Sequence, residues 1–136
     1  MRAEKQTPLL EVENLKVDFQ VEKQVVQAVK GISYQLMPGE ILGIVGESGS
    51  GKSVSSYGIM GLLPTNGRIT EGNIWYKGKN LAHMTDAQMN GIRGKEISMI
   101  FQDPMTSLDP VFTIGYQIEE ILKAHTSINR RQRKQR

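Results

Sequence analysis

The chain has 136 residues, of which 38% are hydrophobic, and it carries a formal net charge of +3 with no cysteine. This length indicates one domain or part of one, and the lack of cysteine excludes disulfides and thiolate metal sites. No apolar run reaches the about 18 residues that a membrane-spanning helix requires, so we expect no transmembrane segment.

The first third of the chain shows the period of β-strands. Apolar and polar side chains alternate along residues 15–21 and again along residues 32–36, and residues 25–29 are rich in valine. This alternation predicts half-buried strands. We therefore expect several antiparallel strands after a flexible arm of residues 1–8.

A glycine-rich stretch then fits the phosphate-binding loop pattern G-x-x-x-x-G-K-[ST] at each required position. Its residues are Gly46, Glu47, Ser48, Gly49, Ser50, Gly51, Lys52 and Ser53. The apolar run at residues 41–45 predicts a strand buried on both faces, and residues 54–63 predict a helix that Pro64 ends. Strand, loop and helix is the order that phosphate binding requires.

The chemistry of such a loop is specific. Successive backbone N–H groups and the N-terminus of the following helix hold phosphate oxygens. Lys52 would place its charge near the β- and γ-phosphates, and the hydroxyl of Ser53 would ligate Mg²⁺. We therefore expect nucleotide binding here. The loop alone also fits P-loop kinases and GTPases, so the class of protein stays open at this point.

Weaker patterns continue toward the C-terminus. Residues 69–76 predict one or two further strands, and residues 81–92 predict a short helix. Residues 97–101 form a second apolar run, which we interpret as another buried strand. A helix is predicted over residues 113–124, where isoleucines recur at helical spacing.

The chain finishes on a basic tail. Its charged residues are Arg130, Arg131, Arg133, Lys134 and Arg136, and the net charge without these five is −2 instead of +3. A basic tail can bind nucleic acid or an anionic membrane, but no aromatic side chains are interleaved here as stacking platforms. We interpret the tail as a solvated helix face and expect no nucleic-acid partner.

A second motif begins within the apolar run at residues 97–101. It reads Phe-Gln-Asp-Pro-Met-Thr-Ser-Leu-Asp-Pro and resembles the glutamine-loop region of ABC-transporter ATPases. The form is similar to that of the branch that imports oligopeptides, dipeptides or nickel. The resemblance runs from residue 9 to residue 124 and implies an α/β fold. A P-loop ATPase core would lie beside an antiparallel β subdomain, and residues 125–136 would begin a helical subdomain.

The resemblance also implies roles for single residues. Gln102 would contact Mg²⁺ and the attacking water and would couple the nucleotide state to a membrane subunit. The family stacks adenine on an aromatic residue, but residues 23–26 contain none, so we expect apolar contacts from Val26. The resemblance assigns no catalysis to Asp103 or Asp109, which we interpret as turn and cap residues.

Parts of the family pattern are absent from these 136 residues. No Leu-Ser-Gly-Gly-Gln-like signature, no apolar strand ending in Asp-Glu (the Walker B strand) and no switch histidine occurs. We expect the N-terminal part of an ATPase subunit that binds ATP without efficient hydrolysis. Because the acidic strand would belong to the central sheet, open edges and exposed apolar surface are also expected.

The expected partners follow from the same resemblance. They are a second ATPase subunit, membrane permease subunits and, indirectly, a substrate-binding protein, at the cytoplasmic side of a bacterial inner membrane. A non-catalytic nucleotide-binding or subunit-pairing fragment is the alternative for the short chain.

Overall fold

The computed structural model describes residues 7–103 and 108–135, which form two compact units divided between Met89 and Asn90. Most of the expected flexible arm, residues 1–6, lies outside the described residues. So does the stretch 104–107 of the second motif.

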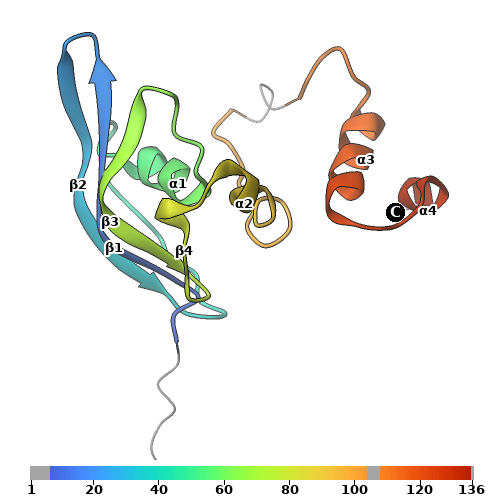
Figure 1. The fold of residues 1–136 in the computed structure, drawn as a ribbon, viewed down its shortest axis with the longest axis horizontal. Helices are drawn as coiled ribbons and strands as arrows, with labels where there is room; N and C mark the ends of the chain where they lie inside the picture. The colour runs from blue at the N-terminus through green and yellow to red at the C-terminus, as the bar shows by residue number, and fades with distance from the viewer. Residues whose placement is uncertain (1–6, 104–107, 136) are drawn as a thin grey trace, which may run out of the picture. The chain divides into compact units, whose positions relative to one another are not determined.

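The first unit is built on a four-stranded antiparallel sheet with the strand order β2-β1-β3-β4 (Figure 1). Its strands are β1 (Leu10–Val21), β2 (Gln24–Leu36), β3 (Gly67–Tyr76) and β4 (Lys79–Asn80). The predicted antiparallel strands ahead of residue 41 are confirmed. The apolar stretches at 25–29 and 32–36 belong to one continuous strand, since β2 runs through Gly31 at a φ of +98°.

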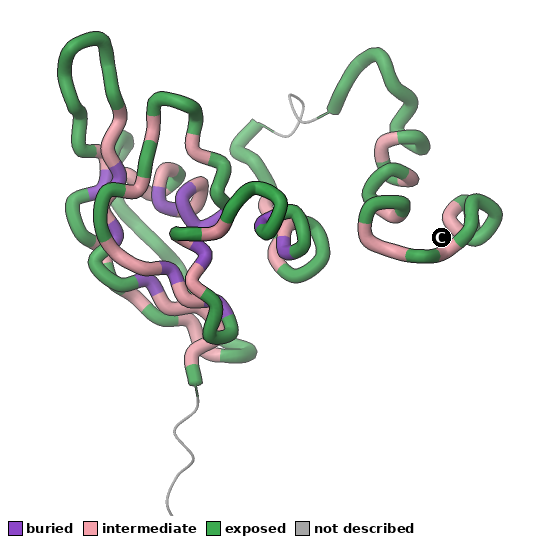
Figure 2. The backbone as a smooth tube through the Cα atoms, viewed as in Figure 1, coloured by how far each residue is buried: buried purple, intermediate pink, exposed green. Residues whose placement is uncertain are grey.

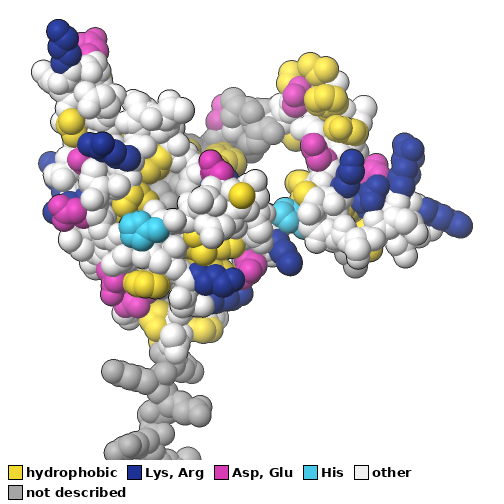
Figure 3. Space-filling model, in the orientation of Figure 1, with side chains coloured by type: hydrophobic (Ala, Val, Ile, Leu, Met, Phe, Trp, Pro, Cys, Tyr) yellow, Lys and Arg dark blue, Asp and Glu magenta, His cyan; other side chains and the backbone are white. Residues whose placement is uncertain are grey.

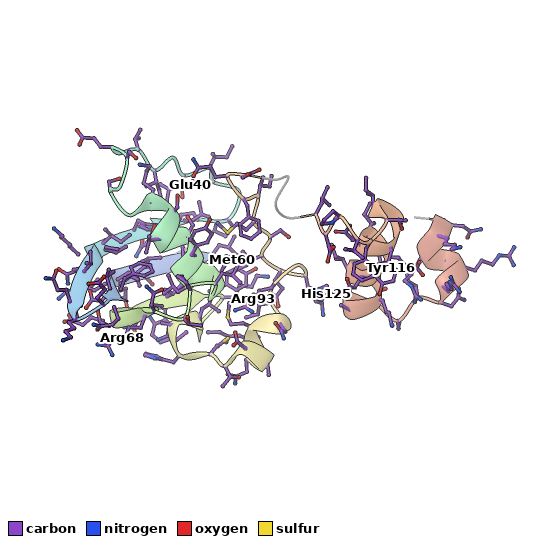
Figure 4. The ribbon with its side chains drawn as sticks, turned by 90° about the horizontal axis from the view of Figure 1, so that it is seen from above. Glu40, Met60, Arg68, Arg93, Tyr116 and His125 are labelled. Atoms are coloured by element: carbon purple, nitrogen blue, oxygen red, sulfur yellow. The ribbon has the colours of Figure 1, made fainter. Side chains whose placement is uncertain are left out.

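The helix α1 (Lys52–Met60) contacts β1, β2 and β3 and lies on one face of the sheet (Figure 4). It ends three residues before the predicted limit at Leu63, because Gly61 adopts a φ of +60°. The N–H groups of Gly61 and Leu62 donate to the carbonyls of Gly58 and Tyr57, which is the glycine-dependent end of a Schellman motif. Gly61 rather than Pro64 therefore ends the helix.

The core of the first unit lies between α1 and the sheet, where buried residues gather in Figure 2. The short helix η1 (Leu81–His83) adds Leu81 to it. Its buried apolar residues are Val12, Leu15, Val17, Val29, Ile59, Met60, Ile74, Tyr76, Leu81 and Met89. Alternate residues of the strands thus supply one apolar layer and the inner face of α1 supplies the other.

Two predictions of buried strands are wrong. Residues 41–45 and 98–101 belong to no strand, and the side chains of Ile41, Val45 and Ile100 are 97%, 96% and 91% exposed. A strand buried on both faces needs neighbouring strands to bond its backbone groups. Within the described residues, no strand pairs with residues 41–45 or 98–101, and the adjacent Ile97 forms only a single bridge, to Arg93. The prediction of exposed apolar surface is confirmed, as Figure 3 shows in yellow.

Beyond the sheet, α2 (Asp86–Asn90) is short, and Thr85 and Gln88 cap it reciprocally through backbone N–H to side-chain oxygen bonds of 2.9 and 3.4 Å. The second unit contains α3 (Ile114–His125) and α4 (Arg130–Gln135). Thr113 caps α3, and Arg133 of α4 pairs with Glu119 of α3 at 3.3 Å. The helix predicted over residues 113–124 and the helical nature of the basic tail are confirmed.

The described residues contain no helix both long and apolar enough to span a membrane.

Replacement of two glycines of the first unit by alanine should change the stability of the fold in opposite directions. At Gly58, inside α1, a Cβ would lie 3.9 Å from Leu15 and Val17, which is ordinary contact. Gly58→Ala should therefore stabilise the fold by up to about 1 kcal/mol through helix propensity. At Gly72, with a φ of +96°, a Cβ would lie 2.5 Å from the carbonyl oxygens of Glu13 and Asn14. Gly72→Ala should cost about 2 kcal/mol or more.

Urea denaturation of the two variants measures both effects. Equal effects of the two substitutions would contradict the packing of α1 at Gly58 and the close approach of Gly72 to the backbone of β1.

Candidate functional site

The glycine-rich loop of residues 46–51 leads directly into α1 (Figure 1). Gly49 and Gly51 hold φ angles of +79° and +88°, in the left-handed region that favours glycine. The N–H of Ser50 donates to the carbonyl of Glu47 at 3.2 Å, so the loop turns back on itself before the helix begins.

Lys52 is bonded into this turn. Its Nζ donates to the carbonyl oxygens of Gly46 and Glu47, each at 2.7 Å, and to Oγ of Ser50 at 3.2 Å. An ammonium group has three protons to donate, and the loop provides an acceptor for each. The positive charge is therefore held beside the loop backbone rather than extended into solvent.

The N-terminus of α1 is suited to bind an anion. Gly51 occupies the N-cap position, no side chain caps the helix, and the first turn contains no acidic residue. The uncapped N–H groups of a first helical turn carry partial positive charge. Ser53 is exposed in this turn. The residues present thus fit the phosphates and the Mg²⁺ of a nucleotide.

An open groove of about 670 Å³ runs between β2 and the loop. Six of the predicted site residues line it, and none of the lining residues is aromatic. The six are Val26, Gly46, Gly49, Ser50, Gly51 and Lys52. Val26 of β2 and the phosphate loop therefore line the same groove. A residue that contacts the base of a nucleotide, with the phosphates at the loop, would need such a position.

The other predicted site residues lie apart from this lining. Glu47 and Ser48 are exposed in the loop, and Ser53 is exposed at the start of α1. The carbonyl oxygen of Glu47 accepts a hydrogen bond from Nζ of Lys52. Gln102 is exposed in the second unit, so its action on a nucleotide at the loop stays a prediction. Asp109 accepts from the N–H of Val111 at 2.9 Å, which confirms its turn role.

Sequence reasoning missed the strand residues that touch the loop. A Cβ at Gly51 would lie 2.6 Å from the carbonyl oxygen of Ala28 and 3.2 Å from Cγ2 of Val29. The motif states that a glycine is needed at this position but not what the glycine approaches. The valine-rich run at residues 25–29 was the available signal, and it indicated only a strand.

No group of three or more histidine, aspartate or glutamate side chains within residues 7–103 and 108–135 is placed to hold a metal ion. A metal at the loop would therefore depend on the phosphates themselves and on hydroxyl or amide ligands such as Ser53.

A model of the ABC transporter family matches residues 29–135 of the chain. The dipeptide transport ATP-binding protein DppD of Bacillus subtilis is 50% identical over 124 residues, which are 90% of this chain and 37% of that protein. DppD of Escherichia coli is 47% identical over 94% of this chain and 39% of its own length. The chain thus spans less than two fifths of the relatives that it matches.

Among solved structures, the dimeric ATP-binding cassette MJ0796 in a post-hydrolysis state bound to ADP and Pi superposes with a TM-score of 0.79. The match covers 93% of this chain and 53% of that one at 23% identity. A likeness at this identity shows a shared fold, and the predicted α/β fold of the ABC ATPase type is confirmed.

A matched pair of glycines tests the close approach of the loop to β2. Both Gly49 and Gly51 have positive φ, but a Cβ at Gly49 would meet nothing within 4 Å. Gly49→Ala should cost only the left-handed strain of about 1 kcal/mol. Gly51→Ala should cost a further 1–3 kcal/mol or so, because its Cβ would collide with the backbone of Ala28. Thermal unfolding compares them, and equal costs would contradict the contact.

Proposed function

This chain belongs to the ABC transporter family, and we propose that its phosphate loop binds the triphosphate of ATP. The arrangement at the start of α1 carries this proposal. An uncapped helix N-terminus and the Lys52 ammonium meet at one glycine-rich turn, which borders a groove shared with Val26. Backbone donors and a fixed positive charge at one point favour a polyanion over a neutral ligand.

Different residues of the site would bind different parts of the nucleotide. The backbone N–H groups of residues 46–52 would hold phosphate oxygens, and Lys52 would donate to the β- and γ-phosphates. The base would lie against Val26 in the groove along β2, where contact is aliphatic because the lining has no ring. The Lys52 ammonium now donates to two loop carbonyls, so the phosphate would replace or share these acceptors.

Mg²⁺ would be held by the Ser53 hydroxyl together with the phosphates, and Gln102 would add an amide oxygen and orient the attacking water. The exposure of Ser53 and its position directly after Lys52 in the phosphate-loop pattern support the first role. For Gln102 the support is the motif that surrounds it.

The parent protein would use ATP binding and hydrolysis to drive the import of oligopeptides, dipeptides or nickel. The curated relatives are dipeptide and oligopeptide transport ATP-binding proteins, which supports the peptide branch. Family membership over residues 29–135 sets aside the kinase and GTPase alternatives.

In that role the chain would pair with a second ATPase subunit and with membrane permease subunits at the cytoplasmic face of a bacterial inner membrane. A substrate-binding protein would act only indirectly. The dimeric state of the similar cassette MJ0796 supports pairing between ATPase subunits.

A second candidate function is favoured by one specific observation. The 136 residues contain no apolar strand that ends in the Asp-Glu pair expected to activate water. Phosphoryl transfer depends on positioning and on charge stabilisation around the attacking water. The chain by itself would therefore bind nucleotide or pair with another subunit without efficient turnover.

The binding proposal predicts that Lys52→Ala weakens affinity for a fluorescent ATP analogue by at least about tenfold, because charge-assisted hydrogen bonds contribute roughly 1.5–3 kcal/mol. Equilibrium titration followed by fluorescence anisotropy measures the change. Lys79→Ala on β4 is the matched control, since this exposed lysine lies outside the groove, and it should bind as the unchanged chain does. Equal affinities of the two variants would refute the role of Lys52.

The second candidate predicts that phosphate release by the 136-residue chain is no faster than release by its Lys52→Ala variant. A coupled phosphate assay with Mg²⁺ and ATP measures both rates. Turnover that depends on Lys52 in this chain alone would show that another group activates the water, and the non-catalytic alternative would be abandoned.

A further inference from the structure

The phosphate loop comes very close to β2 at Gly51, just before α1 begins. The position that a Cβ of Gly51 would occupy is 2.6 Å from the carbonyl oxygen of Ala28 and 3.2 Å from Cγ2 of Val29. The backbone of the loop therefore lies directly on the strand, with no room for a side chain between them.

Val29 is itself fixed in the core. Its side chain is 3% exposed, and its cross-strand partner on β1 is the fully buried Val17. Cγ2 of Val17 would in turn lie 3.9 Å from a Cβ at Gly58 of α1. Gly51 and Gly58 are seven residues apart, close to two helical turns, so they lie on the same side of α1.

Ser55 lies between these two glycines on the same side of the helix. It is 1% exposed, and its Oγ donates to the carbonyl of Lys52 at 2.7 Å rather than to the sheet. Three small residues thus let α1 approach the paired valines closely, and the first of them is the N-cap of the helix.

The other side of the loop has less support. Ile44 and Val45, which precede the loop, are 46% and 96% exposed and belong to no strand. The loop therefore has a buried neighbour in Val29 of β2 at Gly51, whereas the residues that precede it are exposed.

We propose that Val29 is a positioning residue for the phosphate loop. Its Cγ2 supports the left-handed turn at Gly51, and that turn sets the direction of the first N–H groups of α1 and of Lys52 toward the groove. Val29 would not touch the phosphates. The proposal rests on the proposed function of the loop, and it adds that strand β2 holds the loop ready to bind.

The test compares Val29→Ala with Val12→Ala in the full chain. Val12 is 1% exposed on the same sheet but does not line the groove, so its truncation gives a matched loss of core packing. Tripolyphosphate is the probe, because it has no base to contact Val26 or Ala28. Val29→Ala should bind it at least about fivefold more weakly, since small displacements of binding groups have large effects. Val12→Ala should bind within about twofold of the unchanged chain, and Val29→Ile should restore affinity.

A second readout needs no ligand. Hydrogen exchange at the amide of Ser55, which donates to the carbonyl of Gly51 at 2.8 Å, should accelerate in Val29→Ala and stay unchanged in Val12→Ala when followed by NMR. If the unchanged chain binds no tripolyphosphate but shows this pattern, the proposed function fails and the positioning role stands. If exchange at the Ser55 amide responds equally to both substitutions, or to neither, Val29 does not support the loop more than another core valine does, and the inference is overturned.

Discussion

The structure of the first unit depends on how closely α1 approaches the hairpin of β1 and β2. Gly51 lacks the side chain that would collide with β2, Gly58 leaves ordinary contact distance to Val17, and Val17 and Val29 pack opposite them. This contact closes much of the core, and the short helix η1 adds Leu81 beside it. It also places a helix N-terminus beside a strand edge, and the groove at the site forms there.

Local patterns in the sequence correctly predicted the strands whose hydrogen-bonding neighbours lie within the described residues. The strand β1 alternates Leu15 and Val17 with polar residues and finds hydrogen bonds in the neighbouring hairpin strand, so its period of two was sufficient. Residues 41–45 are more hydrophobic, yet Val45 is almost fully exposed. An apolar run shows which side chains favour burial, but a strand also needs neighbours for its backbone groups, and the described residues provide none here.

The candidate site likewise combines residues that the sequence predicts with contacts that it does not predict. Gly51, Lys52 and Ser53 were identifiable because the phosphate motif fixes their spacing along the chain. The closure of the loop on the Lys52 ammonium and the contact of Gly51 with β2 join residues that are distant in sequence, so no spacing rule predicts them. Val29 illustrates the limit, since its sequence environment is that of an ordinary strand valine and only the fold gives it a neighbour in the loop.

Binding and turnover make different demands on such a chain. The loop forms its turn with local hydrogen bonds and a close approach to strand β2, so the turn needs no strand pairing of residues 41–45. Turnover would also need a group positioned to activate the attacking water, which the local turn of the loop does not supply. A chain that spans 37% of a relative such as DppD can therefore contain a formed binding loop. In the exposed runs at residues 41–45 and 98–101, the side chains of Ile41, Val45 and Ile100 are almost fully exposed, so their burial would be favourable.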